Sequence, residues 1–300
     1  MTKTLVVIGG PTASGKTRVA VDLAKKYNSE IISADSRQIY KETSIGTAVP
    51  SPEELSEVKH HFIQFLSLKD YYNASIYEID VIKKLEGLFQ KRDIIFMAGG
   101  SGLYINAVCF GIDDIPSIDQ SIRTKLERKY KEEGLTKIQL LLKELDPISY
   151  ERVDLNNHLR ILKALEVSMQ TGKPYSSFLT NKKRNRDFQV LRIGLDMNRT
   201  LLYDKINSRV FNMIQSGLVD EVKSLSNFRD MNAMKTVGYR EIFRHLDGDI
   251  SLEDAVDLIQ RNTRKYARKQ LTWFRKDNLF SWFEPGNSEG MVRYIEDNLS

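Results

Sequence analysis

The sequence has few of the features that mark secreted or membrane proteins. It contains a single cysteine, Cys109, in 300 residues, which excludes an internal disulfide framework and a zinc site built from several cysteines. No apolar run reaches the roughly 20 residues that a membrane-spanning helix needs. The apolar run 5–8 leads directly into a glycine-rich loop, so the N-terminal residues also lack the pattern of a signal peptide. We therefore expect a cytoplasmic protein with no membrane partner.

That glycine-rich loop has the spacing G-x-x-x-x-G-K-[ST]. Its glycines allow a tight turn that brings backbone N–H groups close to an anion, and the helix that follows directs the positive end of its dipole at the same point. Lys16 adds a charge, and the Thr17 hydroxyl can bind Mg²⁺. The motif predicts a site for a diphosphate or triphosphate, but it does not specify a nucleotide. The expected diphosphate-binding residues are Gly10, Pro11, Thr12, Ala13, Ser14, Gly15, Lys16 and Thr17.

The spacing of apolar residues predicts an α/β fold that is interrupted by helices. Short apolar runs predict strands at 5–8, 30–33, 94–98, 188–195 and 279–283, and helical spacing predicts helices at 17–27, 74–91, 200–215, 252–276 and 290–299. Only helical patterns occur between 117 and 171, at 117–134, 135–145 and 156–171. We expect a P-loop NTPase-like core with a parallel sheet flanked by helices, over 1–115 and 187–300, plus an all-helical insertion domain over 116–186.

Two predicted strand ends carry residues that bear on the chemistry. Asp35 follows the strand 30–33, at the edge of an α/β sheet where ligands bind. A lone Asp after a strand is also a common turn residue, and both interpretations remain open at this point. The strand 94–98 ends without the acidic residue that holds Mg²⁺ in P-loop NTPases, which argues against an ordinary NTP hydrolase. We expect the glycines in 99–102 to let backbone or the same diphosphate approach closely.

Positive charge is concentrated on one predicted helix. The 45 Lys and Arg and the 40 Asp and Glu leave a formal net charge of only +5, which is weak evidence for a polyanionic partner. Within 252–276, however, basic residues recur at spacings that place them on one helical face. This basic stripe consists of Arg261, Arg264, Lys265, Arg268, Lys269, Arg275 and Lys276. A solvated face is the alternative, but such faces usually mix both signs, so we favour a surface that contacts nucleic-acid phosphates.

Several motifs in this order resemble the tRNA dimethylallyltransferase family in its bacterial form. They are Gly-Pro-Thr-Ala-Ser-Gly-Lys-Thr at 10–17, Asp-Ser-Arg-Gln-Ile-Tyr at 35–40, Gly-Gly-Ser-Gly-Leu-Tyr at 99–104, Val-Gly-Tyr-Arg-Glu at 237–241 and Leu-Thr-Trp-Phe-Arg at 271–275. The resemblance covers nearly the whole chain. Where many members carry threonine in the third motif this sequence has serine, which keeps the hydroxyl group.

The resemblance implies an enzyme that moves a dimethylallyl group from dimethylallyl diphosphate to N6 of the adenosine 3′ of the anticodon. It implies that Asp35 is the base, because the exocyclic amine must lose a proton as the new bond forms. Lys16, with Mg²⁺ on Thr17, would stabilise the departing diphosphate. The expected catalytic residues are Asp35, Lys16, Thr17 and Arg209, with Arg123 and Lys205 as further sources of positive charge.

The resemblance also implies that the helical insertion grips the anticodon stem-loop of tRNA. The expected tRNA-binding residues are Asp35, Ser36, Arg37, Gln38, Ser101, Arg123, Leu159, Arg160, Lys163, Thr236, Gly238, Tyr239, Arg240, Arg264 and Arg268. The partners are then tRNA and dimethylallyl diphosphate, the cofactor is Mg²⁺, and we expect a monomer.

Three other functions share part of this pattern. A P-loop small-molecule kinase would have the same loop and core, and a prenyltransferase acting on free adenine nucleotides would share the chemistry as well. Neither needs a basic helix or a helical grip on RNA. An RNA-binding protein with a vestigial loop would not need Asp35 beside an intact Lys16 and Thr17.

Overall fold

The computed structural model describes residues 2–116, 118–180 and 182–299, which form two compact units. Unit 1 consists of Met1–Phe110 and Asn185–Ser300, and unit 2 is Gly111–Arg184. The predicted insertion, 116–186, falls within a few residues of the limits of unit 2. The prediction of an α/β core with an all-helical insertion is confirmed.

Unit 1 is built on a parallel sheet with the strand order β3-β2-β4-β1-β5-β6. The strands are β1 (Thr4–Gly9), β2 (Ile31–Ser33), β3 (His60–His61), β4 (Ile94–Gly99), β5 (Gln189–Leu195) and β6 (Ser281–Phe283). The two-residue edge strand β3 was not predicted, because two residues carry no periodicity. The central strands β1 and β4 are buried almost throughout, as expected for a parallel sheet covered by helices.

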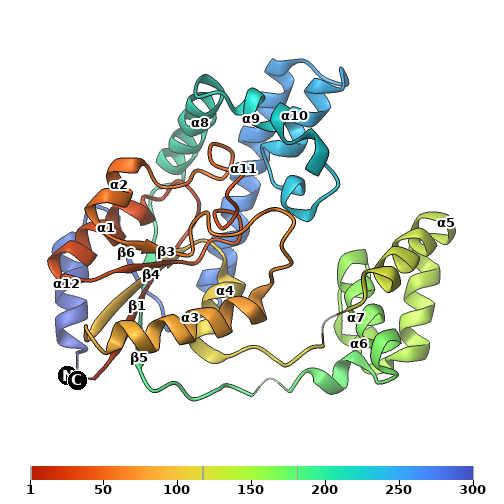
Figure 1. Cartoon of the computed structure of the whole chain (residues 1–300), viewed down its shortest axis with the longest axis horizontal. Helices are drawn as coiled ribbons and strands as arrows, with labels where there is room; N and C mark the ends of the chain where they lie inside the picture. The colour runs from red at the N-terminus through yellow and green to blue at the C-terminus, as the bar shows by residue number, and fades with distance from the viewer. Residues whose placement is uncertain (1, 117, 181, 300) are drawn as a thin grey trace. The chain divides into compact units, whose positions relative to one another are not determined.

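Helices cover the sheet on both faces (Figure 1). Successive side chains of a strand point to opposite faces, and Val6 and Ile8 of β1 pack in one cluster with α1 (Lys16–Lys26) and α12 (Ser288–Asp297). On the other face, α3 (Ala74–Phe89) and α4 (Gly102–Phe110) lie against β4. The short helix α2 (Pro52–Glu57) begins with a capping box at Ser51.

The second half of unit 1 adds a helical layer around its own apolar cluster. Its helices are α8 (Arg199–Gln215), α9 (Leu218–Ser224), α10 (Tyr239–Leu246) and α11 (Leu252–Arg275), with 3₁₀ turns at Ser226–Phe228 and Asn232–Lys235. The cluster includes Val210, Leu218, Ile242 and Ile259, all nearly inaccessible to solvent. The two long helices were predicted, whereas α9 and α10 are too short for a helical period to be read from the sequence.

The described residues of unit 2 form helices joined by loops. It contains α5 (Gln120–Leu145), α6 (Pro147–Arg152), α7 (His158–Thr171) and a 3₁₀ turn at Tyr175–Phe178. Gly134, with φ 80° and ψ −178°, breaks α5 into two helices, which confirms the prediction of separate segments on either side of it. Asp146 and Pro147 start a further helix rather than only ending the previous one, which the sequence did not lead us to expect.

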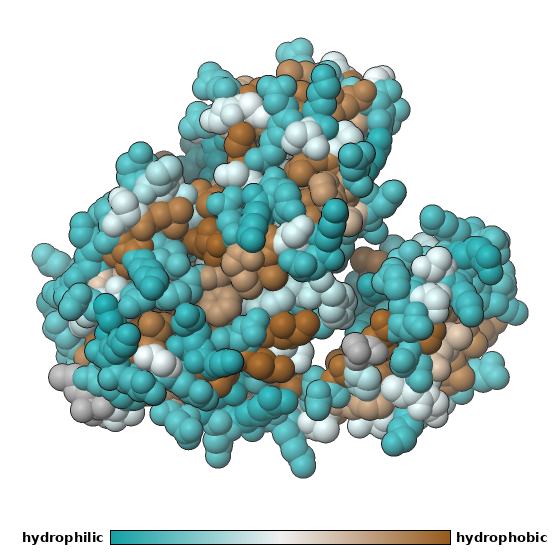
Figure 2. Space-filling model, viewed as in Figure 1, coloured by the Kyte–Doolittle hydropathy of each residue, from teal (hydrophilic) through white to brown (hydrophobic). Residues whose placement is uncertain are grey.

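The face of the molecule in Figure 2 is predominantly polar. Figure 2 shows hydrophilic side chains over most of this face, with apolar side chains confined to smaller areas among them. Within the described ranges, no helix is both long enough and apolar enough to cross a membrane.

Candidate functional site

The glycine-rich loop connects β1 to α1 and forms one wall of a large cavity. Gly15, with φ 88°, precedes the first turn of the helix, in a conformation that glycine adopts without strain. A side chain at Gly10 would meet the Leu195 carbonyl oxygen at 2.9 Å. The glycines therefore allow the tight turn and the close approach of the loop to β5.

The cavity has a volume of about 870 Å³ and lies within unit 1. It is lined by the glycine-rich loop, the ends of β2 and β4, the segment 46–51, α8, residues 235–238 and α11. Five of the expected diphosphate residues line it: Thr12, Ala13, Gly15, Lys16 and Thr17. Gly10, Pro11 and Ser14 do not. The Ser14 hydroxyl is buried and makes no hydrogen bond within the part of the chain that the structure describes, so Ser14 supports the loop from behind.

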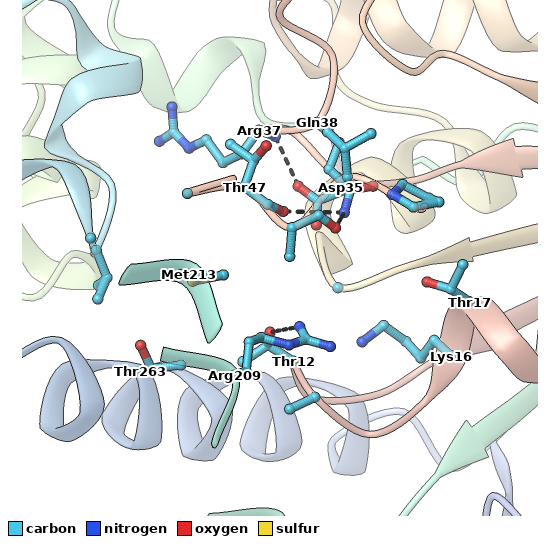
Figure 3. Close-up of a pocket in the computed structure, with 18 of the residues that line it drawn as sticks. Thr12, Lys16, Thr17, Asp35, Arg37, Gln38, Thr47, Arg209, Met213 and Thr263 are labelled. Carbon is cyan, nitrogen blue, oxygen red and sulfur yellow. Dashed lines mark hydrogen bonds between the residues drawn. The ribbon is translucent and has the colours of Figure 1, made fainter. Parts of the chain in front are cut away.

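Two cations converge at the loop end of this cavity. Figure 3 shows the Lys16 ammonium and the Arg209 guanidinium pointing toward the same space. Lys16 Nζ donates a hydrogen bond to the Pro11 carbonyl oxygen at 2.6 Å, and Arg209 Nη1 donates to the Thr12 hydroxyl at 3.3 Å. Burial lowers the pKa of Lys16 to about 7, with the nearby Arg209 acting in the same direction and Asp35 opposing. Burial also lowers the pKa of Arg209. Two partly desolvated cations close together make a site that favours an anion.

Asp35 is both a turn residue and a cavity residue, so neither sequence interpretation excludes the other. Its Oδ1 accepts a hydrogen bond from the Arg37 backbone N–H at 2.9 Å, while the residue lines the cavity. Its Oδ2 has no hydrogen-bond partner within the described ranges and is available to a ligand. Next to it, Gln38 donates to the carbonyl oxygens of Thr47 and Ala48, at 3.2 and 2.8 Å, and so fixes the cavity wall opposite the loop (Figure 3).

The second glycine-rich segment makes room for packing, and two of its glycines, Gly99 and Gly100, also line the cavity. A side chain at Gly100 would overlap the Gln270 amide, and one at Gly102 would overlap the Trp273 ring. These glycines therefore let α11 lie directly on the ends of β4 and α4. Ser101 does not line the cavity: its hydroxyl accepts from the Ser36 backbone N–H at 2.9 Å, which joins the ends of β2 and β4.

The charged side chains of the cavity favour an anionic ligand. Five are basic, namely Lys16, Arg18, Arg37, Arg209 and Lys235, and two are acidic, namely Asp35 and Glu54. Lys205 is exposed and does not line the cavity, and Arg123 belongs to unit 2. Of the cations that the sequence suggested beside Lys16, Arg209 is thus the one placed at the loop.

Comparisons with known proteins identify the family. The profile of the family described as IPP transferase matches residues 38–277. The chain is 46% identical to tRNA dimethylallyltransferase 1 of Bacteroides fragilis over 99% of both chains. The chain belongs to the IPP transferase family. The crystal structure of the tRNA isopentenylpyrophosphate transferase of Bacillus halodurans is 35% identical, with a TM-score of 0.70 over 98% of this chain and 97% of that one. The corresponding enzyme of Staphylococcus epidermidis is 30% identical, with a TM-score of 0.70 over 99% of both chains.

Membership in the IPP transferase family confirms the resemblance inferred from the motifs, but the predicted tRNA-binding residues of unit 1 differ in their surroundings. Thr236 and Gly238 line the cavity together with Ser36, Arg37 and Gln38. The Tyr239 side chain is completely buried, and its hydroxyl donates to Glu221 at 2.7 Å, so it supports the fold from inside. Arg240 is held by Glu241 at 2.7 Å.

The basic stripe on α11 is mostly solvent-exposed. Arg261, Lys265, Arg268 and Lys269 are exposed, and within the described ranges their side chains form no hydrogen bond or ion pair. Arg264 is half-buried and donates to Asn207 Oδ1 at 2.6 Å. These four cations and the exposed Lys276 are therefore available to an external polyanion, whereas Arg275 forms an ion pair with Asp196.

The remaining predicted tRNA-binding residues belong to unit 2. Leu159 and Arg160 are exposed on the first turn of α7. Arg123 forms a double hydrogen bond with the buried carboxylate of Glu166, at 2.6 and 3.2 Å. Burial lowers the pKa of Lys163, with Glu166 opposing. Arg123 is thus already paired within the protein.

Two residues that the sequence did not single out hold the cavity in shape. The buried Gln270 accepts from the Thr12 backbone N–H at 2.8 Å and donates to the Gly100 carbonyl oxygen at 3.0 Å, so it links the two glycine-rich segments. The sequence feature that could have identified Gln270 is the presence of a polar residue within the apolar stripe of α11. Glu221 accepts from three consecutive backbone N–H groups, of residues 44–46, at 2.7 to 3.0 Å. A first-turn Glu is common at helix starts, so its sequence position gave no signal.

The cavity can contribute to a Mg²⁺ site through two oxygen-bearing side chains. The Thr17 hydroxyl and the carboxylate of Asp35 supply the oxygen ligands that Mg²⁺ prefers. No group of three or more His, Cys, Asp or Glu side chains suited to a metal is found in the described ranges. These residues fit an ion that is bound mainly through phosphate oxygens of a substrate.

Proposed function

We propose that the protein transfers the dimethylallyl group of dimethylallyl diphosphate to N6 of the adenosine 3′ of the anticodon, position 37, in tRNA. The products are N6-isopentenyladenosine and diphosphate. The observation that carries the proposal is the convergence of Lys16 and Arg209 on the glycine-rich loop, in the same cavity as Asp35. The membership of the chain in the IPP transferase family supports it, as does the 46% identity to a relative named tRNA dimethylallyltransferase 1.

The cavity residues account for each step of this transfer. The N6 lone pair is delocalised into the adenine ring, so the amine needs a base as it attacks. The bond from N6 to the first allylic carbon forms, the carbon–oxygen bond to diphosphate breaks, and its electron pair leaves with the diphosphate. Asp35 Oδ2 accepts the N6 proton, while the Arg37 N–H on Oδ1 holds the carboxylate in place. Lys16 and Arg209 stabilise the negative charge that grows on the leaving group.

A magnesium ion fits this scheme as a partner of the leaving group. We propose that the Thr17 hydroxyl holds Mg²⁺ together with diphosphate oxygens. When bound, the ion would neutralise part of the charge that develops on the diphosphate.

The proposed acceptor is an anticodon stem-loop in the cytoplasm, bound by a monomer. The exposed cations of α11 supply phosphate contacts, and the exposed Leu159 and Arg160 of unit 2 are further contact residues. The target base must leave its stack to reach a cavity, which is less costly in a loop than in a duplex. Neither a small-molecule kinase nor an enzyme that acts on free adenine nucleotides would need the exposed stripe.

Separate incubations test the proposal. The protein is mixed with dimethylallyl diphosphate labelled in the prenyl group and either unmodified tRNA, AMP or ATP. A fourth reaction contains γ-labelled ATP and no prenyl donor. We expect label in tRNA alone, and none in a stem-loop whose target adenosine is replaced by guanosine. Label in AMP would favour the free-nucleotide enzyme, and loss of γ-phosphate label would favour a kinase. Either result without tRNA labelling would refute the proposal.

A further inference from the structure

The cavity has a polar end and an apolar end. The glycine-rich loop, Lys16 and Arg209 form the polar end. At the other end, Val210, Met213 and Ile259 belong to the apolar cluster that packs α8, α10 and α11 together. If the diphosphate occupies the polar end, as the proposed function requires, the apolar end is the part of the cavity suited to the hydrocarbon chain of the donor.

The spacing on α8 matches the size of that chain. Arg209 and Met213 are four residues apart on one helix, so they lie on the same face with their Cβ atoms about 5–6 Å apart. In Figure 3, Arg209 lies between Lys16 and Met213 along the floor of the cavity. The first carbon of the donor is bonded directly to the diphosphate held near Arg209. A branched chain that is only four carbons long then reaches about as far as the Met213 side chain.

The wall around Met213 is tightly packed. Val210 and Ile259 are each only 2% exposed and contact the rest of the cluster. Met213 is half-buried and, like Val210 and Ile259, lines the cavity. An unbranched methionine side chain fills an irregular space well, and the packed residues around it cannot yield without disturbing the core. A prenyl chain that extends further in this direction would therefore meet the wall.

We propose that Met213 is the residue that limits the length of the prenyl chain, so that the enzyme selects the dimethylallyl donor against longer allylic diphosphates. The same apolar wall keeps water away from the allylic carbon while its bond to diphosphate breaks. In hydrophobic pockets one methylene group changes kcat/KM by about 10- to 200-fold. A wall that excludes one more carbon is thus sufficient for strong selection.

The test shortens this side chain and lengthens the donor by the same amount. Met213→Ala removes three heavy atoms, and 3-methylhept-2-enyl diphosphate has three more carbon atoms than the dimethylallyl donor. We expect the ratio of kcat/KM for the longer donor to that for the dimethylallyl donor to rise at least ~10-fold over wild type, with unmodified tRNA as acceptor. The matched control is Ile214→Ala. Ile214 is also half-buried in the cluster but does not line the cavity, so the ratio should stay at the wild-type value.

A second variant gives the opposite change. Met213→Phe places a bulkier side chain at the apolar end of the cavity. We expect it to raise the KM for dimethylallyl diphosphate and to leave the affinity for the anticodon stem-loop unchanged. The proposal would be overturned if Met213→Ala left the ratio of kcat/KM for the two donors unchanged. It would also be overturned if Met213→Phe weakened tRNA binding and left the KM for dimethylallyl diphosphate unchanged, because the apolar end would then hold the adenine. The wild-type reaction separates the two proposals. If wild type does not prenylate tRNA, the proposed function fails. If wild type prenylates tRNA but Met213→Ala has the same ratio of kcat/KM for the two donors as wild type, only the role of Met213 fails.

Discussion

Unit 1 carries positive charge in two regions with different surroundings. In the cavity, Lys16 and Arg209 are held by hydrogen bonds to the glycine-rich loop, and burial lowers the pKa of both. On α11, the side chains of Arg268 and Lys269 are exposed and form no hydrogen bond or ion pair in the ranges that the structure describes. The first pair is fixed in advance at one point, whereas the cations of the stripe are spread along a helix in contact with solvent.

This difference separates two uses of charge. A fixed, partly desolvated cation interacts strongly with charge that develops next to it, because little reorganisation is needed during the reaction. An exposed cation is screened by salt and acts mainly by displacing counterions from a polyanion. We therefore expect changes in the cavity to act on the rate and changes on the stripe to act on affinity, and four predictions test this division.

The largest decrease in rate is expected for Asp35→Asn. The asparagine carbonyl can still accept from the Arg37 N–H, so the turn survives while the proton acceptor is removed. Removal of a general base typically costs ~10²–10⁴ in rate. Single-turnover prenylation should fall by this factor, with stem-loop affinity unchanged. Wild-type turnover in the variant would show that Asp35 acts only as a turn residue.

Lys16→Ala should lower the rate by ~10²–10³, because it removes one preorganised cation from the leaving group. Lys26→Ala removes the same charge from an exposed position at the other end of α1 and should have no such effect. Comparing kcat for both variants, with circular dichroism to confirm folding, makes the test specific. Equal rates for the two variants would contradict a role for Lys16 at the diphosphate.

The lowered pKa of Lys16 predicts a pH dependence of donor binding. Because this pKa is about 7 in the free protein, the ammonium is already charged below pH 7. Above pH 7 it must take up a proton before it can pair with the diphosphate. The affinity for dimethylallyl diphosphate should then weaken by up to about tenfold per pH unit. Titration calorimetry from pH 6 to 9 measures this slope. The control is Lys16→Arg, whose guanidinium stays protonated throughout this range. Titration of the diphosphate of the donor affects both proteins equally, so identical slopes of log affinity against pH for wild type and Lys16→Arg would refute the explanation.

The smallest effect on catalysis is expected from the stripe. Replacing Arg264 and Arg268 with Gln should reduce the slope of log affinity against log salt by roughly 0.7–0.9 for each phosphate that the variant no longer neutralises. Arg268 should account for more of the change, because Arg264 is partly engaged with Asn207. Turnover at saturating tRNA should change little. The measurement is a titration of labelled stem-loop at several salt concentrations, with the exposed Lys91→Gln as control. If the plots of log affinity against log salt coincide for the double variant and wild type, the stripe is a solvated face that does not contact tRNA phosphates.

The sequence predicted the features that depend on neighbouring residues. The glycine-rich loop, the main strands and the break at Gly134 follow from local spacing and from the backbone freedom of glycine, and the structure contains them. The order of the motifs was also sufficient to infer the family. The residues that line a cavity are harder to infer, because side-chain direction depends on packing. Ser14 and Tyr239 belong to motifs that suggest ligand contact, yet both side chains are buried inside the protein.

Contacts between distant segments could not be read from the sequence at all. The glycines at 100 and 102 suggested close approach of backbone or of a ligand. They accommodate Gln270 and Trp273 from a helix about 170 residues later in the chain, and Gly100 also lines the cavity. A glutamine in an apolar stripe signals a buried polar contact, but not which groups it joins. The prediction that Lys16, Thr17 and Arg209 act together on the diphosphate is consistent with their common position in the cavity, and their roles stay a prediction until the variants are tested.

The carboxylate of Glu221 has a consequence for how the protein is made. It holds the backbone of residues 44–46, which border the cavity, yet it is 177 residues away from Ser44 in the chain. A ribosome that adds about 5–20 residues per second makes Glu221 roughly 9–35 s after Ser44. During that interval the nascent chain already carries the glycine-rich loop and Asp35 but lacks the carboxylate that shapes the opposite wall. A growing chain surrounded by tRNA at the site of translation therefore completes this pocket only when the last third of the protein has emerged.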